Sequence, residues 1–180
     1  GQTTVEQKRS SSLSSMAVVT GGKINRQKIC VDLNEPEAHC SLDGVYLLKD
    51  KEHSDLLIQM NHRAPHCESR QFFKGLMAGA SRGVFQGLVF VDPTASKTDA
   101  YQLNKNLLLG DKSRADSKPQ LQIETDDVKC SHGSTTAQLR PEEIFYLQSR
   151  CMPKSEAQRV LAHGYASEVL MNHKEDSIYS

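Results

Sequence analysis

The chain has 180 residues, no net formal charge and a pI of about 7.2. This length favours one domain with an appended segment. The neutral charge balance argues against a nucleic-acid binder and against a polybasic membrane contact, because both need a basic excess. The hydrophobic content of 37% and aromatic content of 6% are low for a compact sphere but fit an elongated fold.

Five cysteines are scattered along the chain without any Cys-x-x-Cys pair: Cys30, Cys40, Cys67, Cys130 and Cys151. An odd, irregular set predicts free thiols in a reducing compartment, and we expect a cytoplasmic protein. The first twenty residues contain no apolar run typical of a signal peptide, and no apolar run in the chain is long enough to span a bilayer. The chain begins with Gly, which suggests part of a longer protein.

From about residue 9 to residue 132 the pattern is one of short strands separated by turn residues. The predicted strands are Ser11–Val19, Gln27–Leu33, Gly44–Lys49, Asp55–His62, Arg70–Met77, Val84–Val91, Ala100–Leu109 and Gln120–Glu124. No long helical period interrupts the series. The pattern therefore predicts a mainly β body and argues against alternating β and α units.

Three amides alternate with other residues along one predicted strand: Gln102, Asn104 and Asn106. One interpretation is an amide ladder, in which like side chains stack between the coils of a parallel β-helix. The other is a half-exposed strand with its polar residues facing water, which is the more common case. No exact internal repeat in the sequence decides between them.

After Gly133 the pattern becomes helical. Pro141 followed by two glutamates predicts the start of a short helix that ends near Arg150, and a longer helix is expected from Ser155 onward. An apolar stripe on the longer helix, formed by Val160, Leu161, Tyr165 and Val169, must be buried against the β body or against a partner. We therefore divide the chain into a β core of residues 1–137 and a helical segment of residues 138–180.

The strongest candidate site is the pair Cys130 and His132. Residues two apart on a strand point to the same face, so the thiol and the imidazole stand side by side. The alternative is a buried structural cysteine beside a hydrogen-bonded histidine at a strand end. The neighbouring Asp126 and Asp127 cannot both face one substrate from a regular strand, and a pair of turn residues is more consistent with their spacing.

Other motifs in the chain predict ordinary structure. The dipeptides His39-Cys40 and His66-Cys67 match no zinc module, so we expect core thiols next to surface or turn histidines. The glycines at positions 75, 79, 83 and 87 lack the Gly-Lys-Ser/Thr ending of a phosphate-binding loop. We therefore expect no ATP site in this chain.

Several ordered blocks carry a resemblance to a known family. They are Phe73-Lys74-Gly75, Gly83-Val84-Phe85-Gln86-Gly87, Lys97-Thr98-Asp99-Ala100, Gln102-x-Asn104, Asn106-Leu107-Leu108-Leu109, Lys118-Pro119-Gln120-Leu121, the run from Asp126 to Gly133, and the run from Ile144 to Arg150. Together they resemble the C-terminal core of the SufB/SufD family, in its SufD-like branch. The resemblance implies a right-handed parallel β-helix followed by a C-terminal helical pair, and an N-terminal helical domain of the family would lie outside this chain.

The resemblance also implies a function. It predicts a non-enzymatic scaffold subunit of the SUF iron–sulfur cluster assembly machinery, paired with a SufB-type paralogue and a SufC-type ABC ATPase. His132 and Cys130 would serve cluster assembly at the subunit interface as ligands of a transient iron–sulfur cluster shared with the partner. The stripe Val160, Leu161, Tyr165 and Val169 would bind the ATPase. In isolation the chain could also form a homodimer.

The alternative from a different class is a β-helix enzyme, either a Cys130-dependent hydrolase or a carbohydrate-active protein. A cysteine nucleophile needs a base within hydrogen-bond reach, which His132 could provide. The low aromatic content gives little support to a carbohydrate site.

Overall fold

The computed structural model describes residues 1–178, without the side chains of residues 172 and 174–178. Its elements are β1 (Gln2–Gln7), β2 (Ser12–Thr20), β3 (Ile24–Leu33), β4 (His39–Leu48), β5 (His53–His62), β6 (Glu68–Met77), β7 (Arg82–Val91), β8 (Asp99–Leu108), β9 (Arg114–Ile123), β10 (Lys129–Gln138), α1 (Pro141–Gln148) and α2 (Lys154–Ile178).

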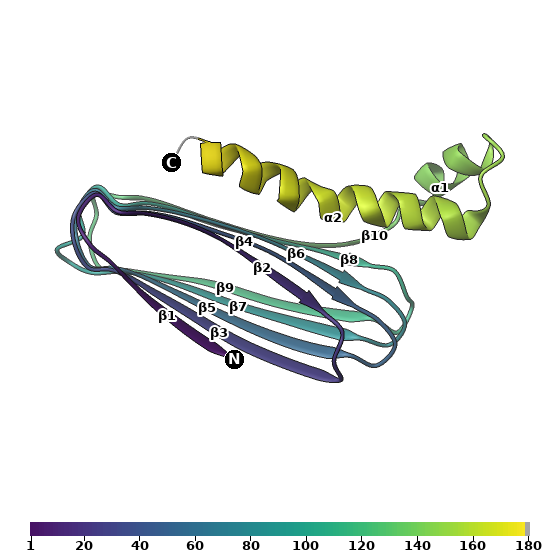
Figure 1. Ribbon diagram of the computed structural model, residues 1–180, viewed down its shortest axis with the longest axis horizontal. Helices are drawn as coiled ribbons and strands as arrows, with labels where there is room; N and C mark the ends of the chain where they lie inside the picture. The colour runs from purple at the N-terminus through teal and green to yellow at the C-terminus, as the bar shows by residue number, and fades with distance from the viewer. Residues whose placement is uncertain (179–180) are drawn as a thin grey trace.

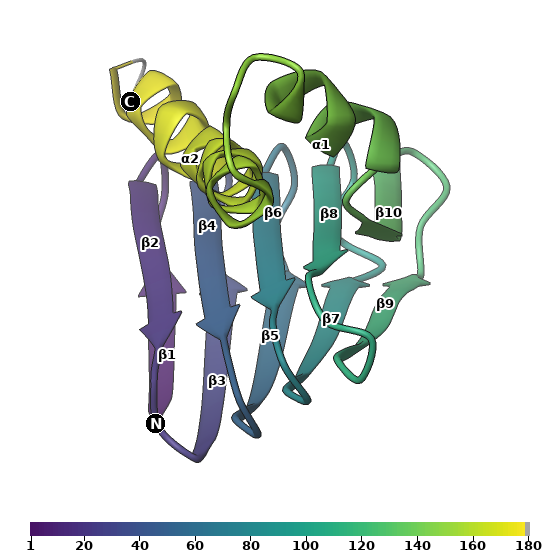
Figure 2. The same ribbon diagram turned by 90° about the vertical axis from the view of Figure 1, so that its right-hand side faces the viewer.

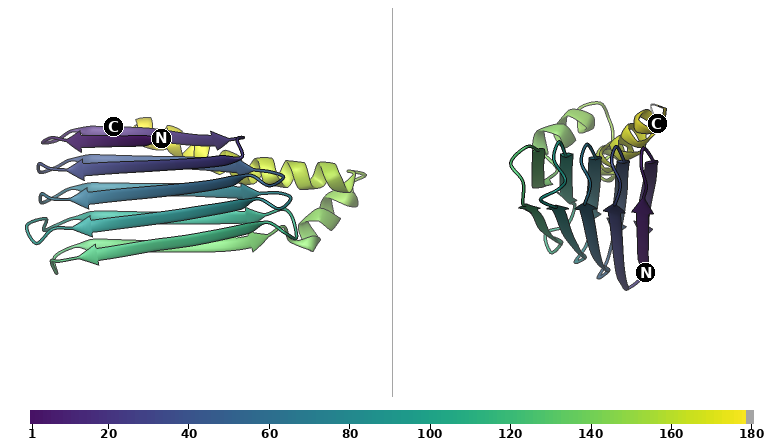
Figure 3. Two further views of the ribbon diagram at one scale, coloured as in Figure 1. Left: turned by 90° about the horizontal axis from the view of Figure 1, so that it is seen from below. Right: turned by 90° about the vertical axis from the view of Figure 1, so that its left-hand side faces the viewer.

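The strands form two parallel sheets that face each other (Figure 1). One has the order β1-β3-β5-β7-β9 and the other the order β10-β8-β6-β4-β2. The chain therefore winds as a solenoid in which each coil adds one strand to each sheet, as the stacked rungs in Figure 3 show. The prediction of a parallel β-helix followed by two helices is confirmed.

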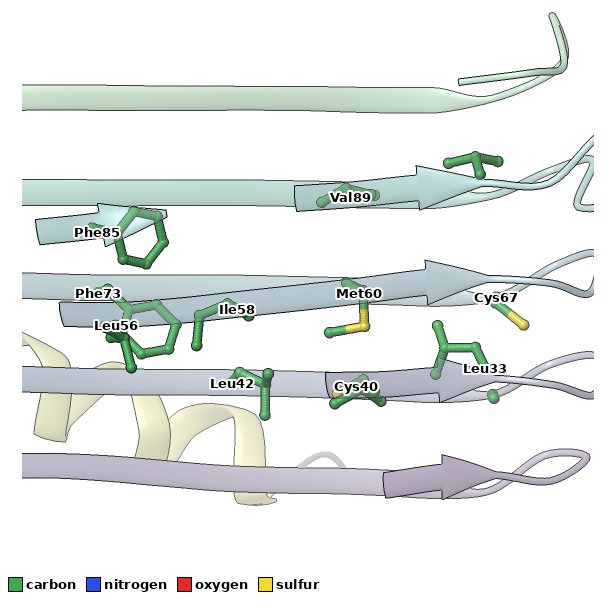
Figure 4. Packing of buried hydrophobic residues seen from close by; sticks show 14 of the residues in the cluster. Leu33, Cys40, Leu42, Leu56, Ile58, Met60, Cys67, Phe73, Phe85 and Val89 are labelled. Atoms are coloured by element: carbon green, nitrogen blue, oxygen red, sulfur yellow. The ribbon is translucent and has the colours of Figure 1, made fainter. Parts of the chain in front are cut away.

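The hydrophobic core fills the space between the two sheets (Figure 4). Successive side chains of a strand point to opposite faces, so every second residue points inward, and these inward positions are mostly apolar. Leu33, Ile58 and Met60 come from one sheet, and Phe73 of the other sheet lies 5.4 Å, between ring centroids, from Phe85. In-register stacking places each of these residues above or below the equivalent residue of the next coil.

The three amides also lie in this interior. Gln102, Asn104 and Asn106 are almost completely buried. Gln102 Nε2 donates to Oε1 of Gln71 on the next coil at 2.9 Å, and Asn106 Nδ2 donates to Asn104 Oδ1 at 2.8 Å. The buried alternative is therefore correct, although only the Gln71–Gln102 pair joins like amides on neighbouring coils.

The turns between coils form a stack of their own. Ser10, Glu37, His66 and Lys97 occupy the same place in successive coils, and all four have positive φ. The backbone N–H of each donates to a carbonyl of the following coil, for example His66 N to Ser96 O at 2.9 Å. The coils thus repeat about every 30 residues.

Four strands differ most from the prediction. β1 was not predicted, and β10 was predicted only around Cys130 and His132. β9 begins at Arg114, six residues earlier than expected, and β4 begins at His39, five residues earlier than expected. β1, β9 and β10 lie at the ends of the sheets, where polar residues are tolerated because one side of the strand faces solvent. Pro119 lies in the middle of β9. The strand tolerates it because β9 is an edge strand, which does not need every backbone N–H as a donor.

Helix α2 lies on the outer face of the sheet that contains β4 and β6 (Figure 2). Its residues Ala162, Tyr165 and Ala166 pack on a small outer cluster that contains Val45 and Leu76. The division of the chain at residue 137 stays a prediction, because this packing joins the helical segment to the β body. None of the helices in the described part of the chain is long and apolar enough to cross a membrane.

Candidate functional site at the open end of the solenoid

Strand β10 is the last strand of its sheet, and in the described structure it pairs with β8 alone. β9 occupies the same position in the opposite sheet. The interior side chains of this last coil therefore have a coil below them, whereas the described residues place none above. The inward-facing positions of β10 are therefore half-buried or exposed, although the equivalent positions of earlier coils are mostly buried in the core.

His132 lies on the interior face of this last coil. It is in register with the buried Gln102, and its neighbour Gly133 is in register with Leu103. A Cβ built on Gly133 would approach Leu103 Cδ1 at 3.1 Å, which places Gly133 on the outer face. Because side chains alternate, His132 faces inward, and it is exposed only because the solenoid is open.

Cys130 shares the inner face with His132, as the spacing predicts. It is half-buried and packs against the edge of the core, one rung above Ala100. Burial raises the pKa of the Cys130 thiol, against an opposing hydrogen bond to the backbone of Ala100, and the charge of Asp99 raises it further. Burial thus favours the protonated thiol over the thiolate, and the thiolate is the form that acts as nucleophile or metal ligand.

The side chain on the rung below His132 is the amide of Gln102, which contacts both Gln71 and Gly87. Gln102 donates to Gln71 below it, and its amide group lies against Gly87 of β7, where any Cβ would collide with the amide atoms. The other amide atom, Gln102 Oε1, is buried and has no hydrogen-bond partner among the described residues. The sequence pattern identified Gln102 as a ladder residue and did not connect it with His132.

The remaining candidate residues lie apart from this site. Asp126 and Asp127 occupy the bend between β9 and β10, and Asp127 pairs with Lys97 at 2.7 Å, so they form no acid–base pair. Cys40 and Cys67 are buried in the core. Their neighbours His39 and His66 are exposed, with His66 in a turn, as predicted. Among the residues whose side chains are described, no group of three His, Cys, Asp or Glu is arranged to hold a metal ion.

The four residues predicted to contact an ATPase are not equally accessible. Val169 is completely buried between α2 and the sheet, and Tyr165 covers the Lys74 ammonium, whose nitrogen lies 3.9 Å from the centre of the ring. Leu161 is half-buried and Val160 is 46% exposed. Most of the stripe therefore packs on the β body, which is one of the two alternatives for its burial.

The family model described as "SUF system FeS cluster assembly, SufBD core domain" matches residues 1–165. The chain belongs to the SufBD core domain family. The match covers all ten strands, α1 and the N-terminal part of α2. It therefore includes both Cys130 and His132.

Individual relatives agree with this assignment. The chain is 36% identical over 155 residues to the iron–sulfur cluster assembly protein SufD of Escherichia coli, covering 86% of this chain and 37% of that protein. It is 35% identical over 170 residues to an iron–sulfur cluster assembly SufBD family protein of Synechocystis, covering 93% of this chain and 37% of the relative. It is also 35% identical over 169 residues to the chloroplastic protein ABCI7 of Arabidopsis thaliana, covering 93% of this chain and 36% of that protein. The chain thus spans little more than a third of the length of these relatives.

Proposed function

We propose that this SufBD core is part of a non-enzymatic scaffold for iron–sulfur cluster assembly. The observation that carries the proposal is the position of Cys130 and His132, side by side on the inner face of an edge strand at the open end of the solenoid. A soft sulfur donor and an imidazole at a subunit boundary can bind iron or sulfide while a second chain supplies further ligands. Its five free cysteines suit a reducing compartment such as the cytoplasm.

A cluster at this site would be cargo shared between subunits. Iron–sulfur clusters are commonly held by four protein ligands, mostly thiolates. The inner face of β10 offers one thiol and one imidazole, while Cys40 and Cys67 are enclosed in the core of other coils. The transient cluster would therefore take its remaining ligands from the partner subunit.

The open end would receive a SufB-type paralogue. Edge strands expose unpaired backbone N–H and C=O groups, which another chain can satisfy by extending the sheets. In β9 and β10 both sheets end at the same place, so one partner could continue both. The isolated chain could satisfy the same groups by forming a homodimer.

A SufC-type ABC ATPase would bind the helical segment. The accessible apolar residues there are Phe145 at 72% exposed, Tyr146 at 55% and Val160, which lie on α1 and the first turns of α2 beyond the ends of the strands (Figure 1). This surface extends the predicted stripe toward α1. Val169 and Tyr165 would support it from beneath by fixing α2 to the sheet.

The β-helix enzyme is the weaker alternative. Burial raises the pKa of Cys130, whereas a nucleophilic cysteine needs stabilisation of its thiolate. Two nearby carboxylates are engaged elsewhere, Asp127 with Lys97 and Asp99 with Arg70. Fast alkylation of Cys130 at neutral pH would favour the enzyme over the scaffold.

The test is the His132→Ala substitution in the full-length protein, expressed in a strain that lacks its own copy. The imidazole is exposed and adds little to core burial, so folding and partner co-purification should be retained. We expect cluster production in cells to fall at least ten-fold. The matched control is His39→Ala, which removes another exposed histidine from a strand end and should leave cluster production unchanged.

Wild-type cluster production by the His132→Ala protein would exclude His132 from the proposed mechanism. Stable reconstitution of a cluster on this chain alone, without the paralogue, would contradict the shared site.

A further inference from the structure

We infer that Gln102 is a positioning residue for His132, and that its side-chain carbonyl accepts a hydrogen bond from one ring nitrogen of the imidazole. This inference rests on the proposed function of His132. It identifies which group in the solenoid interior sets the orientation and tautomer of the exposed imidazole, leaving the other ring nitrogen free for iron.

An unsatisfied acceptor lies on the rung below His132. Gln102 Oε1 is buried and has no hydrogen-bond partner among the described residues, although an unpaired buried carbonyl is destabilising. His132 is the residue directly in register with Gln102 on the next rung, and neighbouring strands of a sheet lie about 4.8 Å apart. Its ring is exposed, so it can rotate about its side-chain bonds to donate to this oxygen.

The amide of Gln102 is anchored by its neighbours. Gln102 Nε2 donates to Gln71 Oε1 at 2.9 Å, and in this arrangement Oε1 is the amide atom left for another donor. Gly87 across the interior leaves room for the amide group, and any larger residue would displace it. In metal-binding histidines, a carbonyl that accepts from one ring nitrogen fixes the tautomer and leaves the other nitrogen for the metal. An anchored Gln102 carbonyl below the His132 imidazole can act in this way.

The experiment measures the tautomer of His132 directly. The full chain would be labelled with ¹⁵N in its histidine rings and studied by NMR at a pH where the imidazole is neutral, with His132→Ala used to assign the signal. The variant is the double substitution Gln71→Met and Gln102→Met, which replaces both amides by apolar side chains of similar length and so leaves no orphaned partner. We expect the ratio of the two tautomers to change at least three-fold.

Two matched controls separate positioning from general disturbance. Gln71→Met alone keeps the Gln102 carbonyl but removes the hydrogen bond that anchors its amide, so it should change the tautomer ratio less than the double variant does. Ser134→Ala removes the other polar side chain next to His132 on the inner face of β10 and should have no effect. An unchanged tautomer ratio in the double variant would overturn the inference.

Cluster production in cells gives the second readout. The double variant should lower it at least three-fold while partner co-purification stays at the wild-type level. An altered tautomer with wild-type cluster production would refute a positioning role. The NMR result does not depend on any cluster, so it stands even where His132→Ala shows that the proposed function is wrong.

Discussion

At the residue scale, His62 is the clearest case of a titratable group that the solenoid interior controls. Its Nε2 is hydrogen-bonded to Ser69 Oγ at 2.9 Å, while its buried Nδ1 has no partner in the part of the chain that the structure describes. Burial lowers the pKa of His62 from 6.5 to about 4. Between these two pH values the unfolded chain binds a proton on His62 that the folded chain does not, so stability must fall as the pH falls.

We predict that this effect removes up to about 3 kcal/mol of unfolding free energy as the pH is lowered from about 6.5 to about 4. The substitution His62→Gln keeps a hydrogen-bonding group near Ser69 and cannot be protonated. Urea unfolding at about pH 7 and about pH 4.5 should therefore show a much smaller loss for the variant than for the wild type. Equal losses for both proteins would contradict the neutral, buried His62.

The sequence predicted the candidate site in part. The spacing of Cys130 and His132 was sufficient to place them on one face, because strand alternation is a local property. It could not show that this face is the interior of an open coil, since that depends on where the solenoid ends. It also could not associate Gln102 with His132, because these residues are 30 positions apart and meet only through the register of β8 and β10.

At the element scale, α2 is attached to the sheet by a buried cation. The Lys74 side chain is completely buried; its Nζ donates to Tyr165 O at 2.9 Å and pairs with Glu168. Burial lowers the pKa of Lys74, and the hydrogen bond from Lys74 lowers the pKa of Glu168. Sequence analysis had placed Lys74 only within a family block, because its partner lies on a helix that is distant in sequence.

We predict that Glu168→Gln destabilises the protein by about 2 kcal/mol, because it leaves the buried Lys74 ammonium without a full counter-charge. The half-exposed position of Glu168 keeps this below the cost for a fully buried pair. Lys74→Met should be much closer to neutral, since it removes the buried charge itself. Chemical denaturation of both variants tests the difference, and a larger loss for Lys74→Met would show that the ion pair contributes net stability.

The exposed end of the helical segment makes a separate prediction. If an ABC ATPase binds this surface as proposed, Phe145→Ser combined with Val160→Ser should weaken that binding at least ten-fold, since a large exposed aromatic side chain such as Phe145 is suited to anchor an interface. The fold should be unaffected because neither residue is buried. Leu170→Ser, at a similarly exposed position farther along α2, is the control. Unchanged ATPase binding by the double variant would place the contact elsewhere.

At the scale of the whole molecule, the sequence indicated the β body correctly but concealed its repeat. The turn positions of successive coils are filled by Ser10, Glu37, His66 and Lys97, four different residues that share only a positive φ. Because the repeat is carried by backbone hydrogen bonds between coils, no residue type has to recur. The end strands β1, β9 and β10 were missed or predicted only in part for a related reason: an edge strand needs only one buried face, so its composition is weakly constrained.

The open end of the solenoid gives the last prediction. Thr136 lies on the inner face of β10, in register with the buried Asn106, and it is exposed because no described coil covers it. If the SufB-type paralogue closes this end, Thr136→Lys places an ammonium group inside the new interior, where an unpaired charge is strongly unfavourable. We expect the affinity for the paralogue to fall at least ten-fold. Ser131→Lys adds the same charge to the same strand on its outer face and should leave pairing intact. Binding measured by titration calorimetry distinguishes the two variants, and equal effects would mean that the partner does not continue the solenoid.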